Sequence, residues 1–343
     1  QENLTLAPET EMEPTDENLL LPAFRYGTSE FLKAIGASKV VIGVSGGIDS
    51  AVNAALYRSI LPAENILLVN TPTRYNSELT KGLAAELAKN LGCQLLTVPI
   101  GDFIDETADA LEGLPLPDDT VHLTGFMKEN MQARDRSSRI LAALSAAFGG
   151  IFTCNANKTE TTVGYGTLYG DLAGAFAATA DLWKYQIYDL GRKLNAWYGR
   201  AVIPEGIFTV MPSAELSENQ DVTQGKGDPL IYEYHDYLFR SFIEPWQRQT
   251  PEDILKAYAK GNLEDLIGCS IIVSNIFPTA KDFIEDLEKW WNLFSGFAVA
   301  KRIQTPPLLA VSRRPYGYDL RESQLRPYYT DAYLSLKEKL LAD

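Results

Sequence analysis

The stretch VVIGVSGGIDSAVNAALYRSIL, residues 40–61, constrains the fold of this chain more than any other feature of its sequence. Apolar or small residues lead directly into SGGIDS at 45–50, and an alanine-rich helical pattern follows. This order predicts a buried strand, a glycine turn and a helix. The two glycines allow the backbone to bend and to present N–H groups outward, and the helix adds its positive N-terminal end. We therefore expect an anion-binding loop at the carboxyl end of the first strand.

Asp49 is the unexpected residue in this loop, because a bare carboxylate repels a phosphate group. The residue suits the site if it holds Mg²⁺, which bridges to phosphate oxygens. The loop lacks the lysine of the Walker pattern G-x-x-x-x-G-K-[ST] and does not match the dinucleotide pattern G-x-G-x-x-G. The alternative interpretation is a strand–turn–helix corner with incidental glycines.

Apolar strands alternate with helical segments along the first half of the chain. The expected strands are 39–44, 66–70, 95–100 and 151–154. Helices are expected over 17–36 and 77–92, and the second carries one apolar stripe, formed by Leu79, Leu83, Leu87 and Leu91. This alternation predicts an α/β fold with a doubly wound, Rossmann-like parallel sheet.

The net charge of −14 argues against two classes of partner. Proteins dedicated to nucleic acid usually carry a basic face, and anionic membranes attract basic segments, so neither partner is expected. No apolar run approaches the roughly 20 residues of a membrane span. Three separated cysteines and the lack of a visible signal peptide indicate reduced thiols in a cytoplasmic protein.

The two histidines, His122 and His235, limit the chemistry that the chain can perform. A histidine zinc site is not expected, and a Ser-His-Asp triad would require one of these two residues in a suitable context. We therefore expect a reaction that depends on phosphate, metal and positioning.

The chain divides into three segments of different composition. Residues 1–17 are polar and acidic and are interpreted as a linker, whereas 18–330 form the main domain and 331–343 a helical tail. Beyond about residue 200 the sequence is mostly helical, and these additional C-terminal helices are expected to surround the sheet. Residues 220–229 are rich in turn-forming types and predict a mobile loop.

Three further motifs follow the glycine loop. They are NMQARDR at 130–136, NANKTETTVGYGTLYGD at 155–171 and KRIQTPP at 301–307. The loop itself resembles the pyrophosphate loop of N-type ATP pyrophosphatases, which have the adenine nucleotide α-hydrolase fold. In this order, over residues of about 20–325, the motifs resemble the NAD synthetases, and VSRRPYGYDLR at 311–321 resembles the glutamine-dependent branch.

The resemblance implies a ligase that consumes ATP. The nicotinate carboxylate of deamido-NAD⁺ would attack the α-phosphate of ATP and release pyrophosphate, and ammonia would then displace AMP to give NAD⁺. The resemblance also implies Mg²⁺ and a homodimer or higher homo-oligomer.

The resemblance also implies roles for individual residues. The Mg²⁺ carboxylates would be Asp49 and Glu160, and the catalytic set would be Asp49, Lys158, Glu160 and Lys184. The ATP-binding residues would be Gly43, Val44, Ser45, Gly46, Gly47, Ile48, Asp49, Ser50, Arg74 and Asn155. The deamido-NAD⁺-binding residues would be Asn130, Arg134, Glu160, Tyr165, Asp171, Lys301 and Arg302.

Several of these residues have an ordinary structural alternative. Lys158 and Glu160 would suit a solvated loop pair, Arg134 a helix-surface ion pair, and Asp171 a helix cap. The pair at 301–302 would suit a basic surface patch.

Nothing in the chain resembles the nitrilase-type glutaminase domain of glutamine-dependent NAD synthetases. The chain begins at Gln1, and we interpret it as the synthetase part of a longer protein that uses free ammonia as it stands. Two other classes remain as alternatives. One is another enzyme with a pyrophosphate loop, similar to GMP synthetase or a tRNA thiolase, and the other is a non-catalytic nucleotide sensor or structural subunit.

Overall fold

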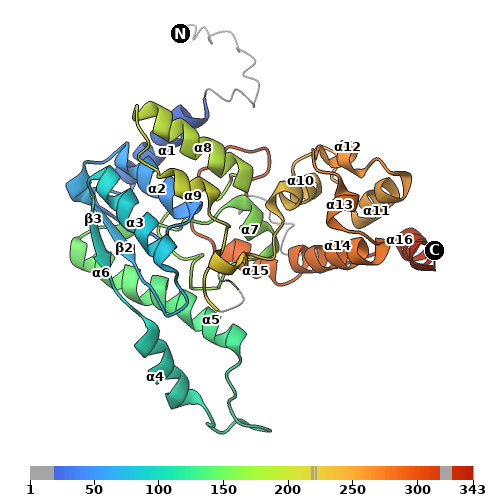
Figure 1. Ribbon diagram of the computed structural model, residues 1–343, viewed down its shortest axis with the longest axis horizontal. Helices are drawn as coiled ribbons and strands as arrows, with labels where there is room; N and C mark the ends of the chain where they lie inside the picture. The colour runs from blue at the N-terminus through green and yellow to red at the C-terminus, as the bar shows by residue number, and fades with distance from the viewer. Residues whose placement is uncertain (1–18, 218–219, 221, 317–326, 343) are drawn as a thin grey trace, which may run out of the picture.

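A parallel sheet of four strands forms the centre of the N-terminal part of the molecule, in the order β3-β2-β1-β4 (Figure 1). The computed structural model describes residues 19–217, 220, 222–316 and 327–342, so the expected linker at 1–17 lies outside the described residues. The strands are β1 (Val40–Gly43), β2 (Ile66–Asn70), β3 (Gln94–Thr97) and β4 (Ile151–Phe152). The predicted doubly wound α/β fold is confirmed.

Two strands end earlier than the sequence predicted. We expected strands over 95–100 and 151–154, but β3 ends at Thr97 and β4 at Phe152. The backbone of Cys154 donates to the carbonyl of Phe176 instead of to a strand, which ends the pairing of β4 with β1. Beyond β3, helix α4 begins at Gly101.

Helices cover both faces of the sheet. One face is covered by α1 (Leu20–Ala34), α2 (Ile48–Arg58), α3 (Glu78–Leu91), α8 (Lys184–Trp197) and α9 (Glu205–Thr209). The other is covered by the last turns of a long helical segment made of α5 (Gly125–Arg134), the π-helical η2 (Asp135–Leu141) and α6 (Ala142–Phe148). The remaining elements of this part are η1 (Ala63–Asn65), α4 (Gly101–Leu111), α7 (Lys158–Val163) and η4 (Val222–Gln224).

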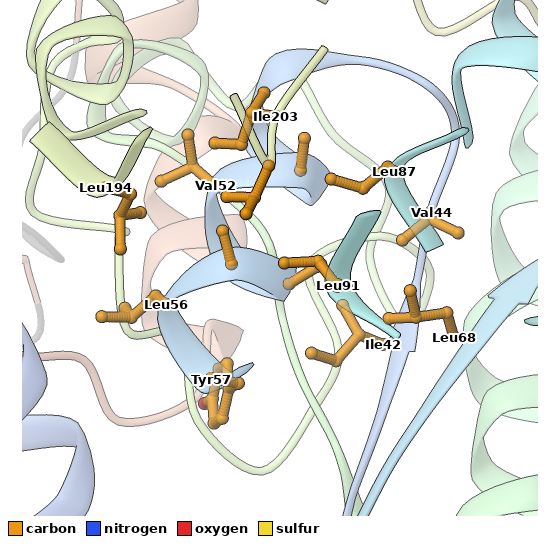
Figure 2. Packing of buried hydrophobic residues seen from close by; sticks show 14 of the residues in the cluster. Ile42, Val44, Val52, Leu56, Tyr57, Leu68, Leu87, Leu91, Leu194 and Ile203 are labelled. Carbon is orange, nitrogen blue, oxygen red and sulfur yellow. The ribbon is translucent and has the colours of Figure 1, made fainter. Parts of the chain in front are cut away.

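Alternation along the strands sends successive side chains to opposite faces of the sheet. Ile42 and Leu68 pack under α2 and α3, whereas Val41, Leu67 and Val69 face the η2–α6 segment. Figure 2 shows the first of these layers, with labelled side chains Ile42, Val44, Val52, Leu56, Tyr57, Leu68, Leu87, Leu91, Leu194 and Ile203. Burial on both faces explains why the strands are continuous apolar runs.

The predicted leucine stripe of α3 is correct for three of its four residues. Leu83, Leu87 and Leu91 are buried, but Leu79 is 51% exposed. A repeat of four residues advances about 40° around an α-helix at each step, so the stripe drifts away from the sheet by the first turn.

The C-terminal helices gather beside the sheet instead of around it, mostly on the right in Figure 1, with α15 nearer the centre. They are α10 (Tyr232–Ile243), α11 (Pro251–Lys260), α12 (Leu263–Ile267), α13 (Val273–Ile276), α14 (Ala280–Ser295), α15 (Ala298–Gln304) and α16 (Asp331–Ala342). A second apolar cluster holds them together and includes Trp183, Trp290 and Tyr333. Because Tyr333 is fully buried, α16 packs as part of this cluster. None of the helices in the described ranges is long and apolar enough to cross a membrane.

A buried ion network joins the sheet region to these helices. The Lys158 ammonium, on α7, is fully buried and donates to Asp181 Oδ1 at 2.8 Å, Glu244 Oε1 at 2.8 Å and Ser312 Oγ at 2.6 Å. Asp181 also accepts from the backbone N–H groups of Val311 and Ser312. One ammonium therefore connects four segments that are distant in the sequence.

We expect Lys158→Met to destabilise the fold by about 3–5 kcal/mol, because two carboxylates lose the cation that compensates their burial. The free energy of unfolding in urea, followed by tryptophan fluorescence, measures the effect. Lys193→Met is the matched control, since Lys193 forms a partly exposed pair with Asp189 and should cost less than about 1 kcal/mol. Equal stabilities for the two variants would contradict the expectation.

Candidate functional site

The candidate site lies where the order of the strands reverses. The chain runs outward from β1 to β2 and β3, then returns to place β4 on the other side of β1. The carboxyl ends of β1 and β4 therefore lie next to each other, and such a switch point is where open α/β sheets bind ligands. The glycine loop follows β1, and the segment 153–157 follows β4. Asn155 Nδ2 connects the two by donating to the carbonyl of Gly43 at 2.9 Å.

The glycine loop adopts a conformation that requires Gly46. This residue has a φ of +91°, and a Cβ there would lie 2.2 Å from the carbonyl oxygen of Thr80 on α3. Gly47, in contrast, has a φ of −90° and would place a Cβ 3.4 Å from Ser45 Oγ. The loop thus depends on one glycine for its turn and for its close contact with α3.

The helix after the loop presents its N-terminus without a side-chain cap. Gly47 is the N-cap of α2 and cannot cap it with a side chain. The loop hydroxyls are engaged locally, because Ser50 Oγ donates to Gly47 O at 3.0 Å and Ser45 Oγ accepts from Gly47 N at 3.3 Å. A helix N-terminus with backbone N–H groups and nearby hydroxyls can bind an anion such as phosphate.

Two carboxylates share one ammonium beside this loop. Lys184 Nζ lies 2.6 Å from Asp49 Oδ2 and 3.1 Å from Glu160 Oε1. Burial alone would lower the pKa of Lys184, but Asp49 and Glu160 together raise it well above its usual value. Burial raises the pKa of Glu160, and the Lys184 ammonium opposes that shift. We therefore treat Lys184 as a permanent cation at the centre of the site.

Each charged residue is held at the start of a helix. Asn157 caps α7 by accepting from Glu160 N at 3.0 Å, and its Nδ2 donates to Asp49 Oδ1 at 2.9 Å. Asp236, on α10, accepts from the backbone N–H of Tyr185 at 2.9 Å and so fixes the first turn of α8. Burial raises the pKa of Asp236 to about 6. The positions of Asp49, Glu160 and Lys184 therefore depend on partners from other elements.

A second hydrogen-bonded chain runs from Glu160 toward the loop at 220–229. The Tyr232 hydroxyl lies 3.0 Å from Glu160 Oε1 and 2.8 Å from Asp228 Oδ2. Asp228 Oδ1 accepts from the Tyr165 hydroxyl at 2.9 Å, and that hydroxyl accepts from Gln220 Nε2 at 3.1 Å. The sequence assigned no role to Tyr232, Asp228 or Gln220, because their link to Glu160 exists only in three dimensions.

These residues surround a cavity of about 210 Å³. Its lining includes the loop residues Ser45, Gly47, Ile48, Asp49 and Ser50 together with Glu160, Lys184, Tyr165 and Asp171. The segment Val210–Glu215, with Thr80, Tyr188, Val222 and Asp228, completes the wall. One cavity therefore joins the predicted phosphate loop, both predicted metal carboxylates and two predicted deamido-NAD⁺ residues.

The structure does not bring every predicted ATP or catalytic residue to this cavity. Arg74 is exposed and forms an ion pair with Asp105 at 3.3 Å. Lys158 is enclosed in the buried network described above and does not line the cavity, so its predicted contact with phosphate stays a prediction. The lining does not include Gly43, Val44, Gly46 or Asn155.

Three of the predicted deamido-NAD⁺ residues bind the segment that follows α7. Asn130 Oδ1 accepts from Thr167 Oγ1 at 2.8 Å, Arg134 Nε donates to Leu168 O at 3.1 Å, and Lys301 Nζ donates to Gly164 O at 2.6 Å. Burial lowers the pKa of Lys301, although Asp171 opposes the shift.

Arg302 differs from its neighbour Lys301, because it is buried and binds the carbonyls of Thr162 and Phe294. Arg302 therefore does not line the cavity, and its predicted contact with the dinucleotide stays a prediction.

The carboxylates suit a magnesium ion by their chemistry. No cluster of three or more His, Cys, Asp or Glu side chains suited to a metal occurs within the described part of the chain. Mg²⁺, however, is often held by one or two carboxylates together with substrate phosphates. Asp49 and Glu160, side by side on the cavity wall next to an anion-binding loop, fit that arrangement.

The fold and the site together define an α/β protein with a glycine loop and a cavity at the switch point of its sheet. A family model described as NAD synthase matches residues 25–267. The match covers more than half of the chain, and the chain belongs to this family.

Curated relatives agree with this assignment. The glutamine-dependent NAD(+) synthetase of Thermotoga maritima is 38% identical over 244 residues, which cover 70% of this chain and 40% of that protein. The enzyme of the same name from Xylella fastidiosa strain 9a5c is 34% identical over 299 residues, which cover 86% of this chain and 48% of that protein. The chain spans about half the length of the curated relatives it matches, or less.

Solved structures show the same fold. A glutamine-dependent NAD(+) synthetase from Cytophaga hutchinsonii superposes with a TM-score of 0.68, covering 96% of this chain and 56% of that one at 17% identity. The NMN synthetase from Francisella tularensis has a TM-score of 0.56, covering 75% of this chain and 94% of that one at 24% identity. These superpositions show a shared α/β fold.

We expect Gly46→Ala to disrupt the phosphate loop and Gly47→Ala to be tolerated by the fold. The first variant places a Cβ against the Thr80 carbonyl at a positive φ, whereas the second meets only the Ser45 hydroxyl at contact distance. A non-glycine residue in this region of φ costs roughly 1–2 kcal/mol before any clash is counted. Thermal unfolding midpoints of the two variants measure the difference. Equal midpoints would contradict the expectation.

Proposed function

We propose that this chain forms NAD⁺ by ATP-dependent amidation of deamido-NAD⁺. The nicotinate carboxylate attacks the α-phosphorus of ATP, and pyrophosphate leaves. Ammonia then attacks the acyl carbon of the adenylated intermediate, AMP leaves, and a proton is lost from nitrogen. Family membership and the relatives' names support the reaction class.

One observation carries the proposal for this site. Lys184 joins Asp49 and Glu160 on the wall of a cavity that the phosphate loop also lines. A carboxylate nucleophile is already ionised at neutral pH, so the first step needs no general base. The first step does need its negative charge to be neutralised, because the nicotinate carboxylate approaches ATP and pyrophosphate leaves. Fixed cations and backbone N–H groups supply this neutralisation.

We propose a separate role for each group of residues. The loop 45–50 and the N-terminus of α2 hold the phosphates, and Lys184 stabilises the charge that develops between the α-phosphate and the leaving pyrophosphate. When bound, Mg²⁺ held by Asp49 and Glu160 would neutralise phosphate oxygens. Tyr165 and Asp171, which also line the cavity, orient the nicotinate part of deamido-NAD⁺.

Further parts of the proposal concern the whole protein. The loop at 220–229 is proposed to close over pyrophosphate, since Val222 and Asp228 already contribute to the cavity wall.

A homodimer or higher oligomer is proposed, and the exposed apolar side chains of Phe126 and Met127 on α5 fit such a contact. A cytoplasmic location is proposed because the three cysteines are free and buried.

The first test is an assay of the purified chain with MgATP, deamido-NAD⁺ and ammonium. We expect NAD⁺ and AMP in equal amounts, and Asp49→Asn should lower kcat by at least about a hundredfold, as for other charge-stabilising groups. The asparagine has nearly the same shape but lacks the negative charge, and its single oxygen replaces only one of the two carboxylate oxygens that accept from Asn157 and Lys184.

The control variant for that assay is Asp189→Asn on α8, which removes a partly exposed carboxylate away from the cavity. It should keep the activity of the unmodified chain. AMP without NAD⁺ would retain the ATP chemistry but assign a different acceptor, and the absence of both products would contradict the proposal.

A second test concerns the source of nitrogen. Burial raises the pKa of Cys93 to about 11 and that of Cys154 to about 12, and it also raises the pKa of Cys269. Thiols in this state are poor nucleophiles at neutral pH. We therefore expect the chain to use ammonium and to release no glutamate from glutamine. If the chain released glutamate from glutamine and a cysteine substitution abolished the release, the expectation of ammonium use would be wrong. The same result would show that no separate nitrilase-type glutaminase unit is needed as the nitrogen source.

A further inference from the structure

Glu215 has an unusual conformation on the cavity wall. It has a φ of +46° and is one of two non-glycine residues with positive φ in the described ranges. Its side chain is nearly fully buried, with 2% of the residue exposed. Both features are unfavourable for a charged residue with a Cβ, so the surrounding contacts must hold it in place.

The carboxylate of Glu215 accepts hydrogen bonds from one short segment that precedes or begins α3. Its two carboxylate oxygens accept from Asn76 Nδ2 at 3.3 Å, Ser77 N at 3.2 Å and Thr80 Oγ1 at 2.6 Å. Ser77 is also the N-cap of α3, where it accepts from Thr80 N. The carboxylate therefore acts as a second cap for α3, supplied from more than a hundred residues away.

The first turn of α3 in turn supports the phosphate loop. The carbonyl of Thr80 fills the space that a Cβ on Gly46 would need, so α3 and the loop are in direct contact. Any shift of this turn would have to move the loop or open a gap beneath it. The loop conformation therefore depends on a helix end that Glu215 fixes.

The segment that carries Glu215 also forms part of the cavity wall. Ser213 Oγ accepts from Glu215 N at 3.1 Å and donates to Gln220 O at 2.7 Å. Residues 210–215 all line the cavity. One buried carboxylate thus sets the distance between this wall and the phosphate loop.

We propose that Glu215 is a positioning residue for ATP, which fixes the first turn of α3 and the segment 210–216 so that the phosphate loop is preformed. The identity of the nucleotide rests on the proposed function. Glu215 acts through α3 and the loop and takes no part in proton or phosphoryl transfer. Asn130, Arg134 and Lys301, which hold the segment after α7, do not contact it.

The test compares Glu215→Gln with Glu264→Gln. Glu264 is a matched control, since its carboxylate also accepts a backbone N–H, from Val273 at 2.8 Å, but lies among the C-terminal helices. We expect Glu215→Gln to raise the Kd and KM for MgATP about tenfold, which corresponds to about 1.4 kcal/mol. The Kd for deamido-NAD⁺ and the kcat at saturating ATP should change less than about threefold, because uniform binding is lost.

Thr80→Val supplies a second variant that removes the hydroxyl partner but leaves the carboxylate. Thr80→Val should also raise the Kd for MgATP. The double variant should have a Kd no higher than that of the more impaired single variant, because both changes break the same interaction. Additive losses would overturn the proposal. So would an unchanged Kd for MgATP, or a parallel loss of affinity for both substrates together with a lower unfolding temperature.

Binding and turnover separate this inference from the proposed function. If the unmodified chain binds MgATP with the expected dependence on Glu215 but forms no NAD⁺, the positioning role stands and the proposed reaction fails. If the unmodified chain binds no MgATP, both are overturned.

Discussion

The site depends on the ion triad in which the Lys184 ammonium neutralises Asp49 and Glu160. Two carboxylates at adjacent strand ends would repel each other and would also repel a phosphate, so a fixed cation between them is required. The parallel sheet creates this need, because it brings the carboxyl ends of β1 and β4 together. The same crowding of charge would suit a reaction whose substrates are anions.

The rest of the structure holds this triad in position. Asn157 links Asp49 to the helix that carries Glu160, and Asp236 fixes the helix that begins with Lys184. The C-terminal helices therefore contribute to the site although their own side chains form much of a separate apolar cluster. Glu215, which also lines the cavity, binds the first turn of α3 in a similar way. Polar side chains that bind the first turns of helices therefore set the geometry of the cavity.

The sequence predicted the sheet and the phosphate loop because their signals are local. A continuous apolar run, two glycines and an alanine-rich helix lie within about twenty residues of one another. The sequence did not show which of the predicted cations reach the cavity. Lys158, Lys184 and Arg302 all resembled ligands of phosphate or dinucleotide, yet only Lys184 lines the cavity, whereas Lys158 and Arg302 are enclosed by carboxylates or carbonyls. Burial of a side chain is a property of its neighbours, which periodicity does not report.

By itself the sequence determined the fold class and the position of the glycine loop, since strand, turn and helix signals lie along one segment, and the family resemblance of its motifs predicted roles for Asp49 and Glu160. Only the tertiary structure decided which cation meets those carboxylates, and that Glu215, Tyr232 and Asp228 belong to the same site. These contacts join segments up to about 140 residues apart, and they form when the helices pack on the sheet. Their energies depend on burial and on the approach of distant charges, which no local pattern in the chain contains.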